Sequence, residues 1–261
     1  MRIVTFASGS TGNCSLITDG KANILIDAGI SMRRVVSALG EYGLTPQDLC
    51  GVLITHEHSD HISGLSMLNK YYRLPIFAPT ELCAVLGDMK PELAASLNDI
   101  SVGEVLNIDS LKIRAFRTPH DAKFSVGYRF EGSGIFAFAT DTGSITDDML
   151  DGLSGADTAL IEANHDMDML RNGPYPYFLK KRILSDHGHL SNNDCGKLAI
   201  MLANSGTKHI ILGHLSRENN TPEKALETVS GALRESDIHI SVAPMKNFLA
   251  VDVGDGVKCL V

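Results

Sequence analysis

The sequence predicts an α+β fold in which two β-sheets pack face to face and helices cover their outer sides. The chain has 261 residues and 44% of them are hydrophobic, which suits one domain over residues 1–261 with a sizeable core. Each half begins with short apolar segments of strand character and continues with alternating strand and helix patterns. Another α+β layering would fit the same pattern, so periodicity alone leaves the fold open.

The first part of the chain is predicted to contain short strands and a few helices. Apolar runs bounded by Gly, Asn and Asp turn residues predict strands at 2–7, 14–18, 22–27, 52–55, 111–117, 125–131 and 135–139. Helical spacing predicts helices at 32–39, 63–71 and 81–86, with Gly40 as the C-cap of the first.

The second part of the chain is also predicted to contain short strands and helices. Strands are predicted at 158–162, 209–212, 238–242, 248–253 and 257–261, and helices at 193–203 and 222–235. Pro222 stands near the start of the last helix, where proline is favoured.

Composition limits the classes of function. The net charge of −8 argues against a bulk electrostatic binder of nucleic acid, so any DNA contact would need a local basic patch. The five cysteines are widely spaced and form no C-x-x-C pair, which indicates reduced thiols rather than a disulfide framework. No apolar stretch approaches the roughly 18 residues that a membrane helix needs, and the apolar run at 3–7 is too short for a signal peptide. We therefore expect a soluble cytoplasmic protein without membrane association.

Four potential metal ligands follow the predicted strand at 52–55 in the pattern H-x-H-x-D-H. They are His56, His58, Asp60 and His61. In an extended segment alternate residues project to the same side, so His56 and His58 can share one metal while Asp60 and His61 reach a second. Imidazole and carboxylate ligands suit Zn, Mn or Fe. The alternative is a solvated histidine-rich turn.

Three further residues directly follow predicted strands. They are His120, Asp141 and His214. Ligands on loops at the edge of a rigid sheet are a common way to build a site. Any one of them alone would more often be a surface or capping residue, but together they complete the ligand set that two divalent metals require.

The succession of H-x-H-x-D-H, a lone His, a lone Asp and a final His resembles the five-motif signature of the metallo-β-lactamase superfamily. The resemblance spans roughly residues 3–220 and implies an αβ/βα four-layer sandwich. It implies a first metal bound by His56, His58 and His120. It implies a second metal bound by Asp60, His61 and His214, with Asp141 bridging the two. His58 replaces the Glu of the oxygen-reducing branch, and Asp141 stands where zinc β-lactamases carry Cys or Ser, which together imply a binuclear hydrolase.

Two segments resemble the H-E-A-T and G-H-S-T motifs of tRNase Z-like phosphodiesterases. They are I-E-A-N-H-D at 161–166 and G-H-L-S at 188–191. The resemblance implies that Glu162 orients His189 and that His189 is the general acid. The sequence departs from the motifs at positions 161 and 190, which hold Ile and Leu. His187 is a competing candidate, and the plain alternative is that Ser191 or Asn192 caps a helix and His189 is a loop residue.

Three segments resemble the YycJ/WalJ-type exonuclease branch of this superfamily. They are S-G-S-T-G-N-C at 8–14, S-D-H-G-H-L-S-N at 185–192 and L-S-R-E-N at 215–219. The resemblance implies a DNA exonuclease that acts from the 5′ end. In that reaction Asp60 and Asp141 would position the attacking water. Ser216 or Arg217 would stabilise negative charge on the substrate, and His187 would also contact the substrate.

A basic and aromatic segment lies between the Asp141 and His214 loops. It comprises Arg171, Tyr175, Tyr177, Phe178, Lys180, Lys181 and Arg182. Such residues can follow a nucleic-acid backbone and stack on bases, although a solvated loop with some rings in the core would look the same. The interval between Asp141 and His214 leaves little room for an inserted domain.

Three other functions remain open from the sequence. The first is a small-molecule phosphodiesterase. The second is a thioester or lactone hydrolase of the glyoxalase II type, which would need the metals but not His189 and Glu162. The third is a non-catalytic binding module, which the full ligand set argues against.

Overall fold

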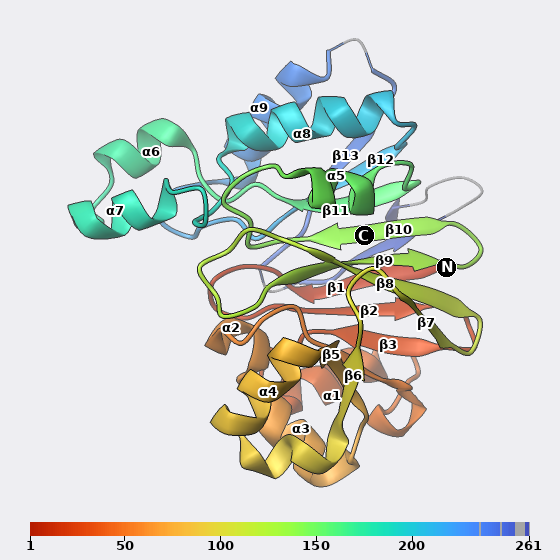
Figure 1. Ribbon diagram of the computed structural model, residues 1–261. Helices are drawn as coiled ribbons and strands as arrows, with labels where there is room; N and C mark the ends of the chain where they lie inside the picture. The colour runs from red at the N-terminus through yellow and green to blue at the C-terminus, as the bar shows by residue number, and fades with distance from the viewer. Residues whose placement is uncertain (235, 246, 254–258, 261) are drawn as a thin grey trace.

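Two β-sheets lie face to face at the centre of the computed structural model, and helices cover the outer side of each sheet (Figure 1). The structure describes residues 1–234, 236–245, 247–253 and 259–260. The helix–sheet–sheet–helix layering confirms the predicted α+β fold with two packed sheets, and it is the order that the family resemblance implied.

The first sheet has eight strands in the order β15-β14-β1-β2-β3-β4-β5-β6. Their bounds are β1 (Arg2–Ala7), β2 (Cys14–Thr18), β3 (Asn23–Ile26), β4 (Gly51–Leu53), β5 (Ile76–Pro79), β6 (Leu97–Ile100), β14 (Leu249–Asp252) and β15 (Cys259–Leu260). Strands β3 to β6 are parallel, so each connection must cross from one end of the sheet to the other, and helical segments make these crossovers. The helices on this side are α1 (Met32–Gly40), α2 (Ser59–Ile62), α3 (Leu65–Tyr72) and α4 (Thr80–Met89), with 3₁₀ turns at Pro46–Asp48 and Pro91–Ser96.

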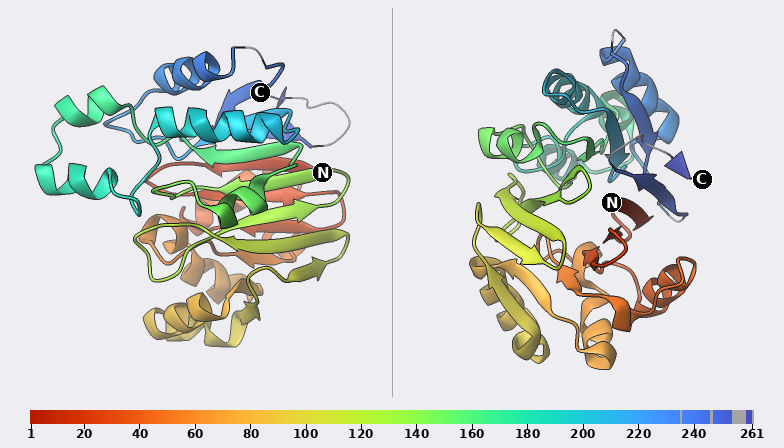
Figure 2. Two further views of the ribbon diagram at one scale, coloured as in Figure 1. Left: turned by 45° about the horizontal axis from the view of Figure 1, so that its top comes forward. Right: turned by 90° about the vertical axis from the view of Figure 1, so that its right-hand side faces the viewer.

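The second sheet has seven strands in the order β13-β12-β11-β10-β9-β8-β7. Their bounds are β7 (Val105–Ile108), β8 (Leu111–Arg117), β9 (Val126–Glu131), β10 (Ile135–Ala139), β11 (Thr158–Glu162), β12 (His209–Gly213) and β13 (His239–Val242). Three helices cover its outer face: α5 (Asp147–Leu153), α8 (Asn192–Asn204) and α9 (Pro222–Ala232). Two short helices, α6 (Met167–Asn172) and α7 (Tyr177–Ile183), instead project from one end of the sandwich (Figures 1 and 2).

The core joins the two sheets. Buried side chains from both sheets belong to one hydrophobic cluster, among them Ile17 and Ile24 from the first sheet and Phe130 and Phe136 from the second. A second cluster lies between the outer face of the second sheet and helices α5, α8 and α9. The buried Tyr128 of β9 donates a hydrogen bond of 2.6 Å to the carbonyl oxygen of Ile54, just beyond β4, and so links the sheets beside the end of β4.

Most predicted elements form, with several corrections. Gly40 is the last residue of α1 rather than its C-cap, and Glu41 takes the cap position with ordinary helical angles. The helix predicted at 63–71 begins earlier as two short helices, α2 and α3, and the helix predicted at 222–235 ends at Ala232. Strands β5, β6 and β7 and helices α5, α6 and α7 were not predicted. Each of these elements has only four to seven residues, too few for a clear periodicity. The strand predicted at 257–261 falls partly outside the described residues.

The described part of the chain contains no helix that combines the length and the apolar character needed to cross a membrane. The cysteines at positions 14, 50, 83 and 195 are free thiols.

Acid stability should depend on His209, which is buried on β12. Its Nε2 atom lies 2.8 Å from Ser241 Oγ on the neighbouring strand. Burial, with the ring of His239 beside it, lowers the pKa of His209 to about 4. Because the unfolded side chain has a pKa of about 6.5, the unfolded chain binds the additional proton between these values. The free energy of unfolding should therefore fall as the pH decreases from about 6.5 to 4, by up to about 1.4 kcal/mol per pH unit from this residue. Urea unfolding at pH 7 and pH 5 should show a shallower pH dependence for His209→Gln than for the wild type, and equal slopes would contradict the prediction.

Candidate metal centre

The seven predicted metal ligands come together at one edge of the sandwich. Donor atoms of His56, His58 and His120 all lie within 4.8 Å of one another, and so do those of Asp60, His61 and His214. Asp141 lies between the two groups: its carboxylate oxygens are 3.2 Å from His61 Nε2 and 3.3 Å from His214 Nδ1. The structure thus assembles the two predicted sets, with Asp141 next to both.

Strained backbone at the strand ends turns these side chains inward. Asp27, Asp141 and His214 follow β3, β10 and β12 closely and have φ values of 60°, 57° and 54°. An L-residue in this left-handed region costs roughly 1–2 kcal/mol, and such strain persists where the surrounding structure enforces it. Gly29 permits a close approach here, because a Cβ atom on it would lie 1.6 Å from the carbonyl oxygen of Asp60.

Four histidines of the cluster are held through their Nδ1 atoms. The partners are Thr55 Oγ1 for His56 at 3.0 Å, Asp27 Oδ2 for His61 at 2.7 Å, the carbonyl of Gly188 for His120 at 3.1 Å, and Glu162 Oε1 for His214 at 2.8 Å. Such contacts fix the ring orientation and leave Nε2 as the ring nitrogen that a metal ion could bind, which is the usual arrangement around protein-bound metals. His58 differs, because its Nδ1 lies 3.2 Å from His120 Nε2.

The chemistry of this donor set fits divalent metal ions. The Nε2 atoms of His56 and His214 are buried and have no hydrogen-bond partner among the described residues. A buried polar atom without a partner is costly unless something else satisfies it. Neutral imidazoles and ionised carboxylates in one buried cluster are the ligands that ions such as Zn²⁺ take.

The electrostatics keep the acidic groups ionised. Burial raises the pKa of Asp141, but His214 and His61 outweigh it and hold the pKa well below its usual range. Burial likewise works against ionisation of Glu162, yet His189 and His214 lower its pKa to about 2. Burial lowers the pKa of His61, but Asp27 and Asp141 raise it to about 10. A metal ion must therefore displace a tightly held proton from His61, so metal affinity should increase with pH.

Two residues that the sequence analysis did not single out support the cluster. Asp27 is fully buried, accepts a hydrogen bond of 2.9 Å from the backbone N–H of Thr55, and orients His61. An acidic residue directly after a buried strand was the available signal. Asp121 follows His120, and its Oδ1 lies 3.4 Å from His120 Nε2.

His189 lies beside the cluster and His187 does not. His189 Nδ1 is 2.8 Å from Glu162 Oε1 and 3.8 Å from Asp141 Oδ1. His187 is exposed, and among the described residues no contact joins it to the cluster. Ser191 is indeed the N-cap of α8, where its Oγ accepts a hydrogen bond from the backbone N–H of Asp194 at 3.1 Å. The capping role and the placement of His189 in the site are therefore compatible.

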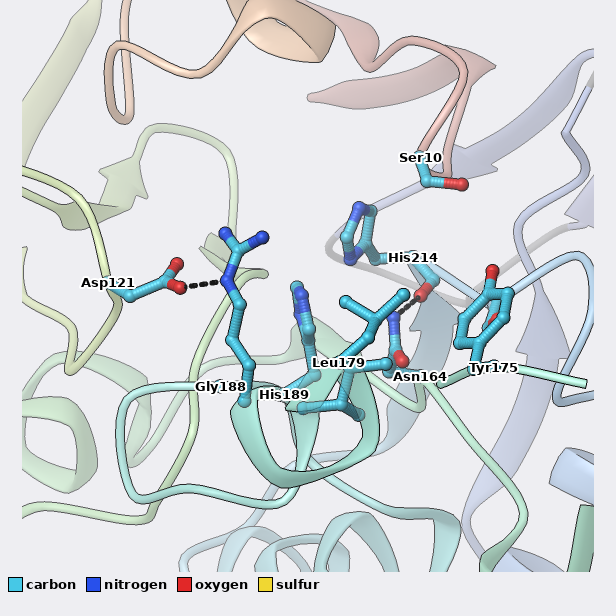
Figure 3. A pocket seen from close by; sticks show the side chains of 11 residues that line it. Ser10, Asp121, Asn164, Tyr175, Leu179, Gly188, His189 and His214 are labelled. Atoms are coloured by element: carbon cyan, nitrogen blue, oxygen red, sulfur yellow. Dashed lines mark hydrogen bonds and ion pairs between the residues drawn. The ribbon is translucent and has the colours of Figure 1, made fainter. Parts of the chain in front are cut away.

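A small cavity of about 150 Å³ opens beside these residues (Figure 3). Its lining includes Ser10, Tyr175, Arg182, His189, His214 and Ser216. Arg182 on α7 forms an ion pair with Asp121 at the rim, drawn as a dashed line in Figure 3. Of the predicted substrate contacts, Ser216 lines the cavity, whereas the Arg217 side chain is 72% exposed and lies 4.0 Å from Glu218.

Comparison with known proteins agrees with this geometry. Residues 22–215, which include all seven predicted ligands, match the family model described as the beta-lactamase superfamily domain. The chain belongs to this superfamily. It is 40% identical over 240 residues to a protein named exodeoxyribonuclease WalJ from Streptococcus pneumoniae, an alignment that covers 90% of this chain and 89% of the relative. It is 37% identical over 239 residues to one named exodeoxyribonuclease YycJ from Bacillus anthracis, covering 91% and 90%.

A solved structure supports the fold of this superfamily member. The metallo-beta-lactamase fold protein YhfI from Bacillus subtilis superposes with a TM-score of 0.74 at 17% identity, covering 95% of this chain and 98% of that one. Together with the family match, this confirms the fold that the motifs implied.

Metal affinity should depend on Asp27, although Asp27 is not a predicted ligand. Asp27→Ala removes the partner that orients His61, and loss of such a partner typically weakens metal binding by roughly 10–100-fold. Metal retained against a graded chelator, measured by atomic emission, should fall accordingly. Asp19→Ala, in the turn at the opposite end of β3, is the matched control and should retain metal as the wild type does. Equal retention in both variants would contradict the role of Asp27.

Proposed function

We propose that this protein is a binuclear metal-dependent phosphodiesterase that removes nucleotides from DNA, beginning at the 5′ end. The observation that carries the proposal is the pairing of His189 with the buried Glu162 beside the metal cluster. The relatives named exodeoxyribonucleases, aligned over nine-tenths of the chain, support DNA as the substrate.

The proposed centre holds two divalent cations, zinc or manganese, with iron as a further candidate. His56, His58 and His120 would bind one ion, Asp60, His61 and His214 the other, and Asp141 both. When bound, such ions lower the pKa of water and offset negative charge on phosphate oxygens.

The protein's own groups supply the proton transfers. Asp60 and Asp141 are ionised acceptors that can orient an attacking water, since nearby histidines hold the pKa of each carboxyl below its usual range despite burial. Burial lowers the pKa of His189, but Glu162 outweighs it and raises the pKa above the usual value. Because Glu162 occupies Nδ1, the protonated ring can donate from Nε2 to the departing oxygen.

Substrate contacts follow from the lining of the cavity. Arg182 and Ser216 are the groups that can bind phosphate oxygens there. The cavity of about 150 Å³ is small, so we place the reacting phosphate group in it and the bases outside it. Arg217 and His187 are exposed beyond this cavity, and contacts from them would require a longer segment of the substrate.

The Glu162–His189 pair also separates this proposal from a thioester hydrolase. A departing alkoxide from a phosphodiester needs a proton, whereas a departing thiolate is stable without one. A thioesterase would therefore gain little from a positioned acid. A small-molecule phosphodiesterase would use the same acid, and it remains the second candidate because the cavity is small.

His189→Ala should lower the turnover of end-labelled DNA by roughly 10²–10⁴-fold in the presence of Mn²⁺ or Zn²⁺, since it removes the proposed general acid. Metal content measured on the same sample should stay at the wild-type level, because His189 is not a proposed ligand. With the label at the 3′ end, stepwise shortening from the 5′ end distinguishes exonuclease action from internal cleavage.

His187→Ala is the matched variant. If His187 supplies the proton instead, the large loss will occur in this variant and not in His189→Ala. If the wild type leaves DNA intact but hydrolyses a thioester, a lactone or a small phosphodiester, the exonuclease proposal is wrong. The proposed metal centre would be unaffected by that result.

A further inference from the structure

We propose that the outer face of the α6–α7 hairpin, residues 167–185, is a binding site for single-stranded DNA that takes a nucleobase and its flanking phosphates. The proposal deepens the proposed exonuclease function and rests on it for the identity of the ligand. It concerns a groove separate from the metal cavity. The groove encloses about 470 Å³ and is lined by Arg171, Tyr177, Lys180, Lys181, Leu184 and Ser185.

The hairpin exposes large apolar side chains to solvent. It projects from one end of the sandwich, in the blue-green part of the ribbon (Figures 1 and 2). Tyr177 is 81% exposed, Phe178 74% and Leu184 45%. The alternative in which these rings are tucked into the core is therefore wrong for Tyr177 and Phe178. Neighbouring exposed rings beside cations are typical of a surface that binds something.

The charges on the hairpin favour a polyanion. Lys180 Nζ donates hydrogen bonds of 2.8 Å to the carbonyls of Arg171 and Gly173, so this lysine fastens α7 to the end of α6. Arg171 and Lys181 are exposed, and no ion pair involving them is found among the described residues. The groove lining contains no acidic side chain, although the chain as a whole carries a net charge of −8. Free cations beside an exposed ring match the phosphates and bases of a single strand.

Helix α7 connects this groove to the metal cavity. One side of it presents Tyr177 and Lys181 to the groove, and the other presents Leu179 and Arg182 to the cavity. The rotation of 100° per residue places Phe178 between Lys181 and Arg182. The two sites are thus about one helix diameter apart, ~10 Å, with an exposed aromatic ring between them. A strand whose terminal phosphate lies in the cavity can therefore cross α7 into the groove.

The test is binding of a fluorescent single-stranded oligonucleotide to the metal-loaded protein, measured by anisotropy over a range of salt concentrations. The oligonucleotide carries phosphorothioate linkages, so that it resists hydrolysis during the titration. Tyr177→Ala should weaken binding roughly tenfold through loss of stacking, and Tyr177→Phe should restore it. Lys181→Ala should weaken binding and reduce the slope of log affinity against log salt by about one. Thermal melting checks that each variant is folded.

Two variants are matched controls. Tyr71→Ala removes a tyrosine of α3 that is 60% exposed, and Lys208→Ala removes a lysine at the end of β12 opposite His214. Both should bind as the wild type does. Equal affinities for all variants, or a wild type that binds no single strand, would overturn the proposal.

The outcomes distinguish this proposal from the proposed function. If the wild type degrades DNA and Tyr177→Ala binds it normally, the groove assignment is wrong and the exonuclease stands. If the wild type binds single strands through Tyr177 but degrades none, the assignment of the groove as a DNA site is supported and the proposed exonuclease function is wrong. If Tyr177→Ala abolishes self-association in sedimentation and leaves DNA binding unchanged, the exposed rings form a protein interface, and the DNA site is wrong.

Discussion

The carboxylate of Glu162 is the interaction on which the rest of the site depends. It is fully buried, and both of its oxygens are used. Oε1 accepts hydrogen bonds from His189 and His214, and Oε2 accepts from the backbone N–H groups of Thr142 and Leu190 at 2.9 and 3.1 Å. A buried carboxylate without such partners would cost several kcal/mol. These partners come from the loops after β10 and β12 and from the loop before α8, so burial of Glu162 depends on all three loops.

The metal cluster also requires both sheets. Asp27 and the H-x-H-x-D-H segment follow strands of the first sheet, whereas Asp141 and His214 follow strands of the second. The positive φ angles of Asp27, Asp141 and His214 would not persist in isolated loops, because each costs roughly 1–2 kcal/mol. Parallel pairing of β3 with β4, of β10 with β11 and of β11 with β12 fixes the strand ends that enforce these angles. Strain is thus distributed over two sheets that share one core.

Local patterns determined much of what could be predicted from the sequence. The strands at 111–117, 135–139 and 158–162 were predicted with their observed bounds, because each has an alternating or continuous apolar pattern. The proposed metal ligands could be singled out because each closely follows a strand or lies within the H-x-H-x-D-H motif. The layering itself needed the family resemblance. The role of Asp27 could not be predicted, since it depends on β3 lying beside β4. Helices α6 and α7 were missed because they are short and flank Gly173, Pro174 and Pro176.

Charge is the remaining constraint, since an acidic protein must accept a polyanion if the proposed function holds. Asp27, Asp60, Asp141 and Glu162 together would repel a phosphate, and bound divalent cations would reverse the local sign. At the rim, Arg182 is paired with Asp121 rather than free. Both side chains are partly exposed, and ion pairs of this kind contribute only about 0–1 kcal/mol. A phosphate can therefore replace the Asp121 carboxylate at little cost, and Arg182 can change partners without leaving the cavity. Because Arg182 belongs to α7, the side chain that would bind the phosphate is on the same helix as Tyr177 and Lys181, which line the groove.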